Sequence, residues 1–324
     1  MQMTQKICIG LIGAGKVSFF HGKGYLNLKD QVEVKVADII EKNAKERAAH
    51  IGAEYVTDYR ELLKDETVDA VDICLPNYLH APVTVEACEA GKHVLVEKPM
   101  ANTVKEADEM LSAAHKNGVH LMVVHSNRFL PVNNYLMREL PSIGKISWVH
   151  ATKEHPKCPG TWYANPEKSG GGVLLDVGIH AADLILWCSN QRATRVYASV
   201  TTVGEVSVED VAFCQMELTG NVKASFFVSW ASPLSSNTLK VRGDTEEKGL
   251  TSDMKAQNVT FKGKEKEPVN CPQTEPETAM TVKAFVKSIQ KDAPPPITGE
   301  DGKKALQIIE AAYESVINQK WVSL

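Results

Sequence analysis

Residues 6–124 alternate short apolar runs with stretches whose apolar positions recur at helical spacing. The short runs predict buried strands, and the periodic stretches predict the helices between them. Thr103 and Glu106 have the spacing of a helix-opening capping box, as do Asp58 and Glu61. The predicted strands span residues 6–12, 32–37, 71–75, 94–97 and 121–124, and the main helices 16–28, 43–51, 81–90 and 104–117. This order predicts a doubly wound parallel sheet that binds its ligand at the carboxyl ends of the strands.

After residue 126 the pattern changes to strand-like runs with few helices between them. Such runs, at residues 146–151, 196–203, 211–218, 222–230, 239–242 and 259–262, predict a mainly antiparallel sheet. Helices are predicted over residues 133–140, 173–188, 278–290 and 302–318. We therefore expect an α/β protein with a first domain over 1–126 and a second over 127–324, whose last helix could pack back on the first.

Composition narrows the class of protein. The length of 324 residues fits two domains, and 43% hydrophobic with 23% charged residues is typical of a globular protein. The formal net charge of -4 argues against nucleic acid as a partner. The seven cysteines are scattered without a CxxC pair, which argues against disulfides and a structural metal site. The chain has no signal-peptide pattern and no run of about 18 apolar residues, so we expect a cytoplasmic protein without a membrane segment.

A glycine-rich turn follows the first predicted strand. In Gly13-Ala14-Gly15-Lys16-Val17-Ser18, Gly13 permits a tight turn and Gly15 lets a pyrophosphate approach the backbone. Lys16 and Val17 open the helix, whose first N–H groups can bind the phosphate charge. Ser18 replaces the third glycine of the usual fingerprint but is small enough for close packing. The pattern predicts a dinucleotide-binding loop, with a plain tight turn as the alternative.

Asp38 ends the second predicted strand, 23 residues after Gly15. A carboxylate at this position accepts hydrogen bonds from the adenosine ribose and repels a 2′-phosphate. Ile39 and Ile40 follow, so no arginine stands beside it to accept that phosphate. These residues favour NAD as the cofactor, and NADP stays open because Lys42 could turn toward the ribose.

Two further segments follow predicted strands at the edge where this fold binds ligands. The first is Leu75-Pro76-Asn77-Tyr78-Leu79-His80, and the second is Glu97-Lys98-Pro99. A lysine on the floor of a crevice can orient a carbonyl or favour deprotonation of a bound hydroxyl. The alternative for Lys98 is an ordinary solvated charge. The Lys98-Pro99 bond is also a candidate for a cis peptide, which occurs almost only before proline.

Asp176 and His180 lie in the segment Gly170-Gly171-Gly172-Val173-Leu174-Leu175-Asp176-Val177-Gly178-Ile179-His180. At positions i and i+4 of the predicted helix they would share one face. Histidine is a good proton acceptor from an alcohol near neutral pH, and a carboxylate can orient the imidazole. A buried structural Asp–His pair explains the same pattern equally well.

Together these motifs, in this order, resemble the Gfo/Idh/MocA family of oxidoreductases over nearly the whole chain. The resemblance implies an N-terminal Rossmann domain and a C-terminal domain with a large open sheet that forms a homodimer or homotetramer. It implies hydride transfer between NAD(P) and a sugar, polyol or related hydroxy compound. It also implies catalytic roles for Lys98, Asp176 and His180. Residues implied to bind the cofactor are Gly13, Gly15, Lys16, Val17, Asp38, Leu75, Pro76, Asn77, His80, Glu97, Lys98 and Arg128.

For the substrate, the resemblance points to Lys98, Asp176 and His180 together with Trp162 and Tyr163, where Tyr163 replaces an arginine found in many members. His180 is expected to remove the hydroxyl proton, with Asp176 balancing its charge and the nicotinamide between these residues and Lys98. Two alternatives remain, a glycoside hydrolase that uses NAD transiently and a non-catalytic sensor of dinucleotide and sugar. No metal is expected.

Overall fold

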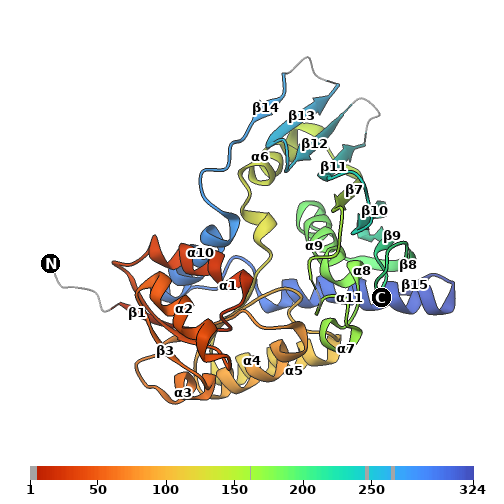
Figure 1. The fold of residues 1–324 in the computed structure, drawn as a ribbon. Helices are drawn as coiled ribbons and strands as arrows, with labels where there is room; N and C mark the ends of the chain where they lie inside the picture. Colours follow the sequence, from red (N-terminus) through yellow and green to blue (C-terminus); the bar gives the residue numbers. More distant parts are fainter. Residues whose placement is uncertain (1–5, 161, 245–247, 264–266) are drawn as a thin grey trace. The chain divides into compact units, whose positions relative to one another are not determined.

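The structure is a computed structural model that describes residues 6–160, 162–244, 248–263 and 267–324 and divides into two compact units (Figure 1). The first unit runs up to Ser126 and also includes Glu275–Lys303. The second consists of Asn127–Thr274 and Lys304–Leu324. The segment 275–303 therefore belongs to the first unit, although it follows most of the second unit along the chain.

The first unit is built on a six-stranded sheet in which all strands run parallel. Its strands are β1 (Ile7–Ile12), β2 (Val32–Ala37), β3 (Glu54–Val56), β4 (Ala70–Ile73), β5 (His93–Val96) and β6 (Leu121–Val123). Its helices are α1 (Lys16–Leu26), α2 (Glu41–Ile51), α3 (Tyr59–Lys64), η1 (Asn77–Leu79), α4 (His80–Glu89), α5 (Val104–Asn117) and α10 (Glu277–Lys291). The strand order β3-β2-β1-β4-β5-β6 is that of a Rossmann fold, as predicted.

Helices cover both faces of this sheet, which is why its strands are continuous apolar runs. Every residue of β1 and β4 is buried. Figure 1 shows α1 and α10 on one side of the sheet and α4 and α5 on the other. The predicted capping box of Thr103 and Glu106 is confirmed at the start of α5, which ends at Gly118.

The strand register brings the residues that follow four strands to one edge of the sheet. Ile12 of β1 pairs with Ala37 of β2 and with Ile73 of β4, and Ile73 pairs with Val96 of β5. The next residues along the chain are therefore neighbours at the carboxyl edge, and these are Gly13, Asp38, Cys74 and Glu97. The predicted ligand-binding edge thus carries the predicted motifs.

The helix α10 joins the first unit by packing on α1. Gly24 of α1 makes this contact close, because a Cβ there would lie 2.9 Å from the Cα of Ala279. Without a side chain at Gly24 the two helix backbones approach each other directly. This contact is one reason why Glu275–Lys303 belongs to the first unit.

The second unit is built on a nine-stranded sheet in the order β14-β13-β12-β11-β7-β10-β9-β8-β15. Its strands are β7 (Ile146–Glu154), β8 (Ala193–Thr201), β9 (Val211–Leu218), β10 (Val222–Ser229), β11 (Asn237–Gly243), β12 (Gly249–Asp253), β13 (Asn258–Lys262), β14 (Val269–Asn270) and β15 (Val322–Ser323). Its helices are η2 (Ser126–Phe129), α6 (Pro131–Glu139), η3 (Leu140–Ile143), α7 (Pro166–Ser169), α8 (Val173–Asp176), α9 (Gly178–Ser189), η4 (Thr219–Asn221) and most of α11 (Gly299–Asn318). Only β7 and β10 pair in parallel among these described strands, which confirms the mainly antiparallel sheet.

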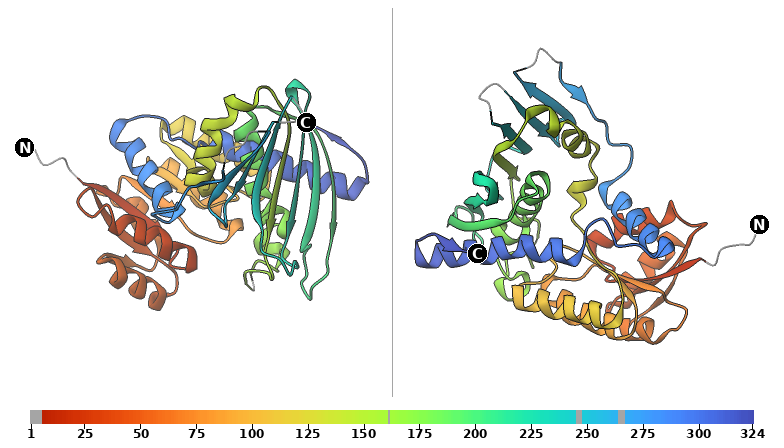
Figure 2. Two further views of the ribbon diagram at one scale, coloured as in Figure 1. Left: turned by 90° about the horizontal axis from the view of Figure 1, so that it is seen from above. Right: turned by 180° about the vertical axis from the view of Figure 1, so that it is seen from behind.

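One face of the nine-stranded sheet is covered by helices. Along β9 and β10 buried residues alternate with half-buried or exposed ones. The helix α9 contacts β7 and β10, and α6 contacts β12 and β13. Figure 2 shows the long strands of this sheet side by side. The alternation is typical of a sheet whose other face is left uncovered by the helices that the structure describes.

The single helix predicted over residues 173–188 is wrong. Two helices, α8 and α9, meet at Val177 instead, and the path from Pro166–Asp176 into Gly178–Ser189 bends by 44°. The chain packs tightly at the break, where a Cβ on Gly178 would lie 3.3 Å from both Leu174 and Phe226. No single helix of the described residues has the length and hydropathy needed to cross a bilayer, and this bent pair meets that test only when its two arms are counted together.

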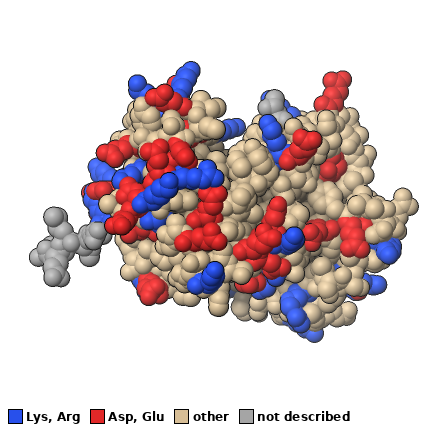
Figure 3. Space-filling view, turned by 90° about the horizontal axis from the view of Figure 1, so that it is seen from below, with Lys and Arg blue, Asp and Glu red and all other residues tan. Residues whose placement is uncertain are grey.

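Charged side chains of both signs mix on the surface. The chain has 36 lysines and arginines against 40 aspartates and glutamates. On the face that Figure 3 displays, basic and acidic side chains are interspersed. This face therefore carries no broad patch of a single sign.

Candidate active site

The loop after β1 has the geometry that its two glycines predict. Gly13 has a φ of +96°, and a Cβ on it would collide with the carbonyl oxygen of Cys74. A Cβ on Gly15 would meet nothing within 4 Å. Gly13 is therefore required by the fold itself, whereas the space beside Gly15 is open for a ligand such as a pyrophosphate.

The helix α1 begins at Lys16 with its first N–H groups available to an anion. Gly15 precedes it without a side-chain cap, and the first turn, which includes Val17, has no acidic residue. Ser18 is fully buried, and its hydroxyl donates to the carbonyl of Gly15 at 2.7 Å. Arg47 of α2 donates to both groups, to the Ser18 hydroxyl at 3.1 Å and to the Gly15 carbonyl at 3.2 Å. The loop is thus braced from outside, and the N-terminus of α1, which has no side-chain cap, is left to bind phosphate.

Asp38 is tied to the same loop by backbone hydrogen bonds. Its Oδ2 accepts from the Ala14 N–H at 2.7 Å, and its Oδ1 accepts from the Ile40 N–H at 2.8 Å. Each carboxylate oxygen can accept more than one hydrogen bond. The half-buried carboxylate is therefore oriented by the fold and can still accept from ribose hydroxyls.

Asp38 lines a cavity of about 690 Å³ that opens beside Gly13. This volume suits a cofactor moiety. Arg60 also lines the cavity, but its guanidinium donates to Glu86 at 3.0 Å and lies 3.9 Å from Asp58. The three carboxylates outnumber the one guanidinium, which disfavours a 2′-phosphate. Sequence reasoning missed Arg60 because it lies far from Asp38 along the chain.

The segment after β4 lies at the same edge. Leu75 lines the cavity, Pro76 precedes η1, and Asn77 is buried. His80 is also buried, with Nδ1 2.7 Å from the carbonyl oxygen of Pro99 and Nε2 2.8 Å from that of Leu75. Both ring nitrogens of His80 therefore face the chain itself, and the ring links the two loops that end β4 and β5.

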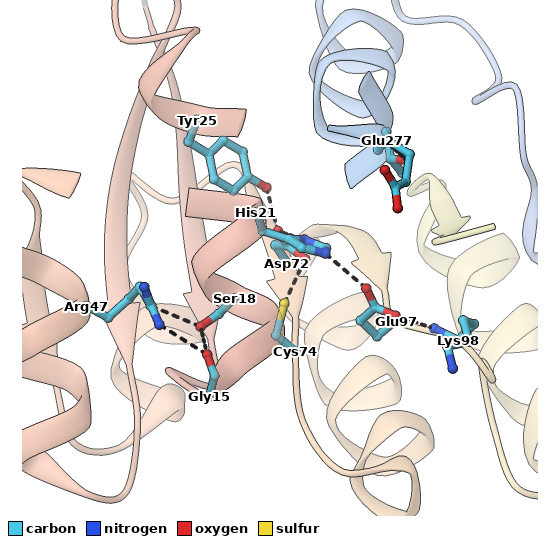
Figure 4. Close-up of polar contacts among 11 residues, drawn as sticks. Gly15, Ser18, His21, Tyr25, Arg47, Asp72, Cys74, Glu97, Lys98 and Glu277 are labelled. Atoms are coloured by element: carbon cyan, nitrogen blue, oxygen red, sulfur yellow. Dashed lines mark hydrogen bonds and ion pairs between the residues drawn. The ribbon is translucent and has the colours of Figure 1, made fainter. Parts of the chain in front are cut away.

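Glu97 and Lys98 follow β5, and the Lys98-Pro99 bond is cis. Lys98 is half-buried, and its backbone N–H donates to Glu97 Oε2 at 3.0 Å. The other oxygen, Oε1, lies 3.0 Å from Nε2 of His21 on α1 (Figure 4). Nδ1 of His21 lies 2.8 Å from Oδ2 of Asp72 in β4. A buried imidazole therefore connects two carboxylates directly behind Lys98.

The charges in this cluster stabilise one another. Burial lowers the pKa of His21, but the charge and hydrogen bond of Asp72 outweigh it and raise that pKa well above its usual value. Burial raises the pKa of Glu97, yet the hydrogen bond and charge of His21 hold it below its usual value. The contacts on both ring nitrogens therefore favour a charged His21 imidazole between Asp72 and Glu97.

His21, Asp72 and Cys74 also offer three metal-ligand atoms within 4.8 Å of one another. A metal would need a neutral imidazole and a thiolate. The pKa of His21 is raised, and burial with the Asp72 charge raises the pKa of Cys74 to about 12. Cys74 keeps its proton and points toward Asp72 at 3.7 Å. His21 and Cys74 therefore keep their protons and hydrogen-bond to Asp72, which disfavours metal binding at these three residues.

In the second unit Gly171 and Gly172 make room for Tyr313 and Glu209. A Cβ on Gly171 would collide with the Tyr313 hydroxyl, and one on Gly172 with the Glu209 carbonyl oxygen. Glu209 Oε1 accepts from the Gly172 N–H at 2.9 Å, the Leu174 N–H at 3.1 Å and the Tyr313 hydroxyl at 2.7 Å. This carboxylate holds the N-terminus of α8, the favourable end for a negative charge.

Asp176 and His180 lie on either side of the helix break. Asp176 is buried as the last residue of α8, and His180 is half-buried in the first turn of α9. The His180 N–H donates to the Val177 carbonyl at 3.2 Å, across the break. Asp176 and His180 therefore do not share one face of a continuous helix, contrary to the sequence prediction. Their positions follow instead from the anchored ends of two short helices.

Arg128, expected at the cofactor, forms a buried ion pair within the second unit. Its Nε lies 3.1 Å and 3.0 Å from the two carboxylate oxygens of Asp183, and its Nη2 lies 2.6 Å from Oδ1. The exposed fractions of these side chains are 9% and 1%. Asp183 stands three residues after His180 on α9, so the pair fixes the helix that carries His180.

Trp162 and Tyr163 form an aromatic cluster with Trp230. Their rings stack with centroids 3.8 Å apart, and Tyr163 meets the ring of Trp230 edge-on at 6.5 Å. The indole N–H of Trp230 is buried and has no hydrogen-bond partner among the described residues. Sequence reasoning missed Trp230, because a tryptophan at a strand end gives no signal by itself.

Comparison with known proteins identifies the family. The model of the oxidoreductase family with an NAD-binding Rossmann fold matches residues 7–125, and that of the GFO/IDH/MocA C-terminal domain matches residues 140–247. The 1,5-anhydro-D-fructose reductase of Ensifer adhaerens is 32% identical over 276 residues, which cover 79% of this chain and 81% of that protein. The chain belongs to the Gfo/Idh/MocA oxidoreductase family.

Two other relatives of this Gfo/Idh/MocA protein differ in sequence identity and in the share of the chain that they cover. The uncharacterized oxidoreductase YrbE of Bacillus subtilis is 34% identical over 200 residues, 60% of this chain and 58% of that protein. Levoglucosan dehydrogenase, solved in complex with NADH and levoglucosan, has a TM-score of 0.88 at 21% identity and covers 98% of this chain and 99% of that chain. The latter likeness shows a shared fold across both units.

The Gfo/Idh/MocA chain thus brings Gly13, Asp38 and Lys98 to one edge of an NAD-binding Rossmann sheet. Asp176, His180 and Arg128 belong to the second unit. Sequence reasoning missed His21 and Asp72, although an aspartate inside an apolar strand was a usable signal. It gave no signal for Arg47 or Glu209, because only the fold brings these residues to the loops they hold.

A pair of substitutions separates the two roles of the glycine loop. Gly13→Ala should destabilise the protein by about 1–3 kcal/mol, because alanine resists a φ of +96°. Gly15→Ala should leave stability unchanged, since its φ is −72° and its Cβ would stand in open space, but should weaken NAD binding. Urea unfolding and calorimetric titration with NAD measure the two effects. Equal NAD affinity in wild type and Gly15→Ala would contradict this assignment.

The buried His21 predicts a stability that declines at alkaline pH. A pKa raised in the folded state adds stability that is fully present below the unfolded value of 6.5 and is lost as pH rises through the folded value. The lowered pKa of Glu97 adds stability above 4.5 that is lost on the acid side. The free energy of unfolding should therefore fall above pH 6.5, with a slope of up to about 1.4 kcal/mol per pH unit for one proton.

Urea unfolding at several pH values from 6 to 9 measures this slope. The control is the double variant His21→Gln/Glu97→Gln, which has neither the imidazole nor the Glu97 carboxyl to take up a proton. Its stability should depend less on pH than that of the wild type over this range. Parallel curves for the two proteins would show that His21 does not titrate with folding.

Proposed function

We propose that this oxidoreductase transfers a hydride reversibly between NAD and a secondary alcohol of a cyclic sugar or polyol. The observation that carries this proposal is the position of Lys98. It follows directly after β5 at the carboxyl edge that also presents Gly13, Gly15 and Asp38. The N-terminus of α1 can already bind the phosphates of the dinucleotide. Lys98 is therefore better suited to donate a hydrogen bond to an alcohol oxygen of the substrate.

Each proposed catalytic side chain has one role. Lys98 donates a hydrogen bond to the substrate oxygen and stabilises its negative charge as the proton leaves. His180 accepts that proton, because imidazole is the side chain suited to proton transfer near neutral pH. Asp176 orients the imidazole and balances its charge. NAD, when bound, accepts the hydride in oxidation, and NADH donates it in the reverse direction.

The proposed substrate class rests on two independent observations. The similar reductase from Ensifer adhaerens is named for 1,5-anhydro-D-fructose, a cyclic hydroxylated compound. The aromatic cluster of Trp162, Tyr163 and Trp230 offers flat apolar faces and a buried N–H donor. Such a combination suits a sugar ring, which has apolar C–H faces and polar edges.

The proposed preference for NAD over NADP rests on charge. The cavity beside Gly13 is lined by the carboxylates of Asp38, Asp58 and Glu86. Arg60 also lines it, and its guanidinium donates a hydrogen bond to Glu86. A 2′-phosphate would meet these carboxylates, and no other lysine or arginine among the described lining residues could balance its charge. We therefore expect catalysis with NADP to be the slower reaction.

We further propose that the uncovered face of the nine-stranded sheet pairs with a second copy of the chain. Residues paired across strands share a face, and Phe227 stands opposite Phe213. Trp148 and Tyr197 lie on the same face and are only half-buried. Several large aromatic side chains on one open sheet favour an oligomer. Sedimentation velocity tests this, and a monomer at micromolar concentration would contradict it.

A substrate screen tests the function. Purified protein is mixed with cyclic sugars, anhydrosugars and polyols plus NAD or NADP, and absorbance of the reduced cofactor is followed. We expect turnover with at least one cyclic compound and faster turnover with NAD. Binding of NAD without turnover across the panel would contradict the proposal. Release of a sugar from a glycoside without net NADH would indicate a hydrolase instead.

A further inference from the structure

We propose that His21 is a positioning residue for Lys98 and acts through Glu97. The inference rests on the proposed role of Lys98 at the substrate oxygen. His21 itself has no proposed contact with the substrate. His21 lies on α1, 77 residues before Lys98, and only the packing of α1 on the sheet brings it behind β5.

The contacts run without a gap from α1 to Lys98 (Figure 4). His21 Nε2 lies 3.0 Å from Glu97 Oε1, and Glu97 Oε2 accepts from the Lys98 N–H at 3.0 Å. The other ring nitrogen of His21 lies 2.8 Å from Asp72, which also accepts from Tyr25 at 2.9 Å. Both oxygens of Glu97 are therefore used, one by the imidazole and one by the backbone of the residue that it positions.

The charges alternate along this path. Two ionised carboxylates can face one imidazole only if both ring nitrogens carry protons. Asp72, His21, Glu97 and Lys98 then carry negative, positive, negative and positive charges in turn. His21 and Asp72 are fully buried, and the Glu97 side chain is 12% exposed. Lys98, at the end of this path, is half-buried and so partly exposed to solvent.

This arrangement is costly for a purely structural contact. Burying ions loses hydration, and well-packed apolar side chains often give equal or greater stability. An apolar residue at position 21 could fill the same space. It could not hold Glu97 ionised and in one rotamer next to Lys98. The imidazolium therefore serves Glu97, and through it the backbone position of Lys98.

Removing the imidazolium should change Glu97 first. In His21→Gln the amide can still donate one hydrogen bond, but no cation separates Glu97 from Asp72. Two nearby carboxylates without a cation raise the pKa of one of them. Asp72 keeps the hydrogen bond from the Tyr25 hydroxyl, so Glu97 is the carboxyl that we expect to take up a proton, and its contact with the Lys98 N–H would then weaken.

The first measurement compares turnover in two variants. His21→Gln should lower kcat by about 10–100-fold, as does the loss of hydrogen-bonding partners that orient the ligands in metal sites, with KM for NAD unchanged. Tyr25→Phe is the matched control, because it removes a buried hydrogen bond to the same Asp72 oxygen without touching Glu97. Tyr25→Phe should lose stability but keep kcat within about 2-fold, since its lost contact is an ordinary buried hydrogen bond. An equal fall of kcat in both variants would overturn the proposal.

The second measurement does not depend on turnover. Labelling lysine with ¹⁵N and glutamate with ¹³C isolates amide signals of lysines that follow a glutamate, and Lys98→Met identifies the Lys98 signal. In the wild type and Tyr25→Phe this signal should stay constant from pH 6 to 8. In His21→Gln it should titrate within that range, reporting protonation of Glu97.

The outcomes separate this inference from the proposed function. If no sugar or polyol is turned over but the Lys98 signal titrates only in His21→Gln, the proposed reaction fails and the positioning of Lys98 stands. If turnover occurs but the Lys98 signal and kcat are the same in His21→Gln and wild type, the reaction stands and His21 has no positioning role.

Discussion

Lys98→Met should lower kcat by about 10²–10⁴-fold while NAD binds with unchanged affinity. Methionine keeps the length of the side chain and removes the ammonium, so the substrate oxygen loses its hydrogen-bond donor. The dinucleotide contacts proposed for Gly13, Gly15 and Asp38 do not involve the Lys98 side chain. Steady-state kinetics on the best substrate and calorimetric titration with NAD measure the two quantities. His180→Ala should give the same pattern, because the proton acceptor is lost.

The chain offers a matched control for Lys98 at the other end of the same strand. Lys92 is buried, and its Nζ donates to the carbonyls of Asp65 at 2.9 Å and Val68 at 2.8 Å. Lys92→Met should cost about 1–3 kcal/mol of stability, since two carbonyls lose their donor, and should leave kcat unchanged. Near-normal turnover in Lys98→Met, or a loss of NAD binding equal to the loss of kcat, would remove Lys98 from the reaction.

Asp183→Ala should destabilise the protein by about 3–5 kcal/mol, the largest effect on stability that we expect from one substitution. The substitution leaves the Arg128 guanidinium buried without the carboxylate that now binds it through Nε and Nη2. The exposed fraction of Arg128 is 9%, so water cannot replace the lost partner without local opening. Urea unfolding followed by circular dichroism measures the change.

Two further variants distinguish a lost ion pair from lost packing. Asp183→Asn keeps hydrogen-bond acceptance at similar volume and should cost less than Asp183→Ala. The double variant with Arg128→Leu and Asp183→Leu should recover much of the loss, because no buried charge remains. If Asp183→Ala and the double variant are equally unstable, lost packing rather than the unpaired charge explains the effect.

Asp183→Ala should also lower kcat, because α9 carries His180.

The first sheet and its loops could be predicted from the sequence because their signals are local. A strand buried on both faces is a continuous apolar run, and a glycine at positive φ ends or turns an element wherever it stands. These rules predicted β2 (Val32–Ala37) with its observed bounds, the capping box of α5, and the loop at Gly13. They missed the largely exposed three-residue strand β3.

The second unit was less predictable, and its errors have physical causes. The strands β12, β14 and β15 are short or polar and exist because neighbouring strands offer them hydrogen bonds. The break at Val177 lies in a segment that is apolar on all sides, so no periodicity marks it. Glu209 and the packing of Gly178 decide it, and both are contacts with distant parts of the chain.

By itself, the sequence determined where strands and helices form in the first unit and which residue types stand at the carboxyl ends of its strands. Tertiary structure alone decided which of these residues are paired. The partners His21 and Asp72, Arg128 and Asp183, and Gly24 and Ala279 lie 51, 55 and 255 residues apart. Propensity and periodicity act between neighbours along the chain, whereas a buried charge takes its partner from whatever the packing brings within reach.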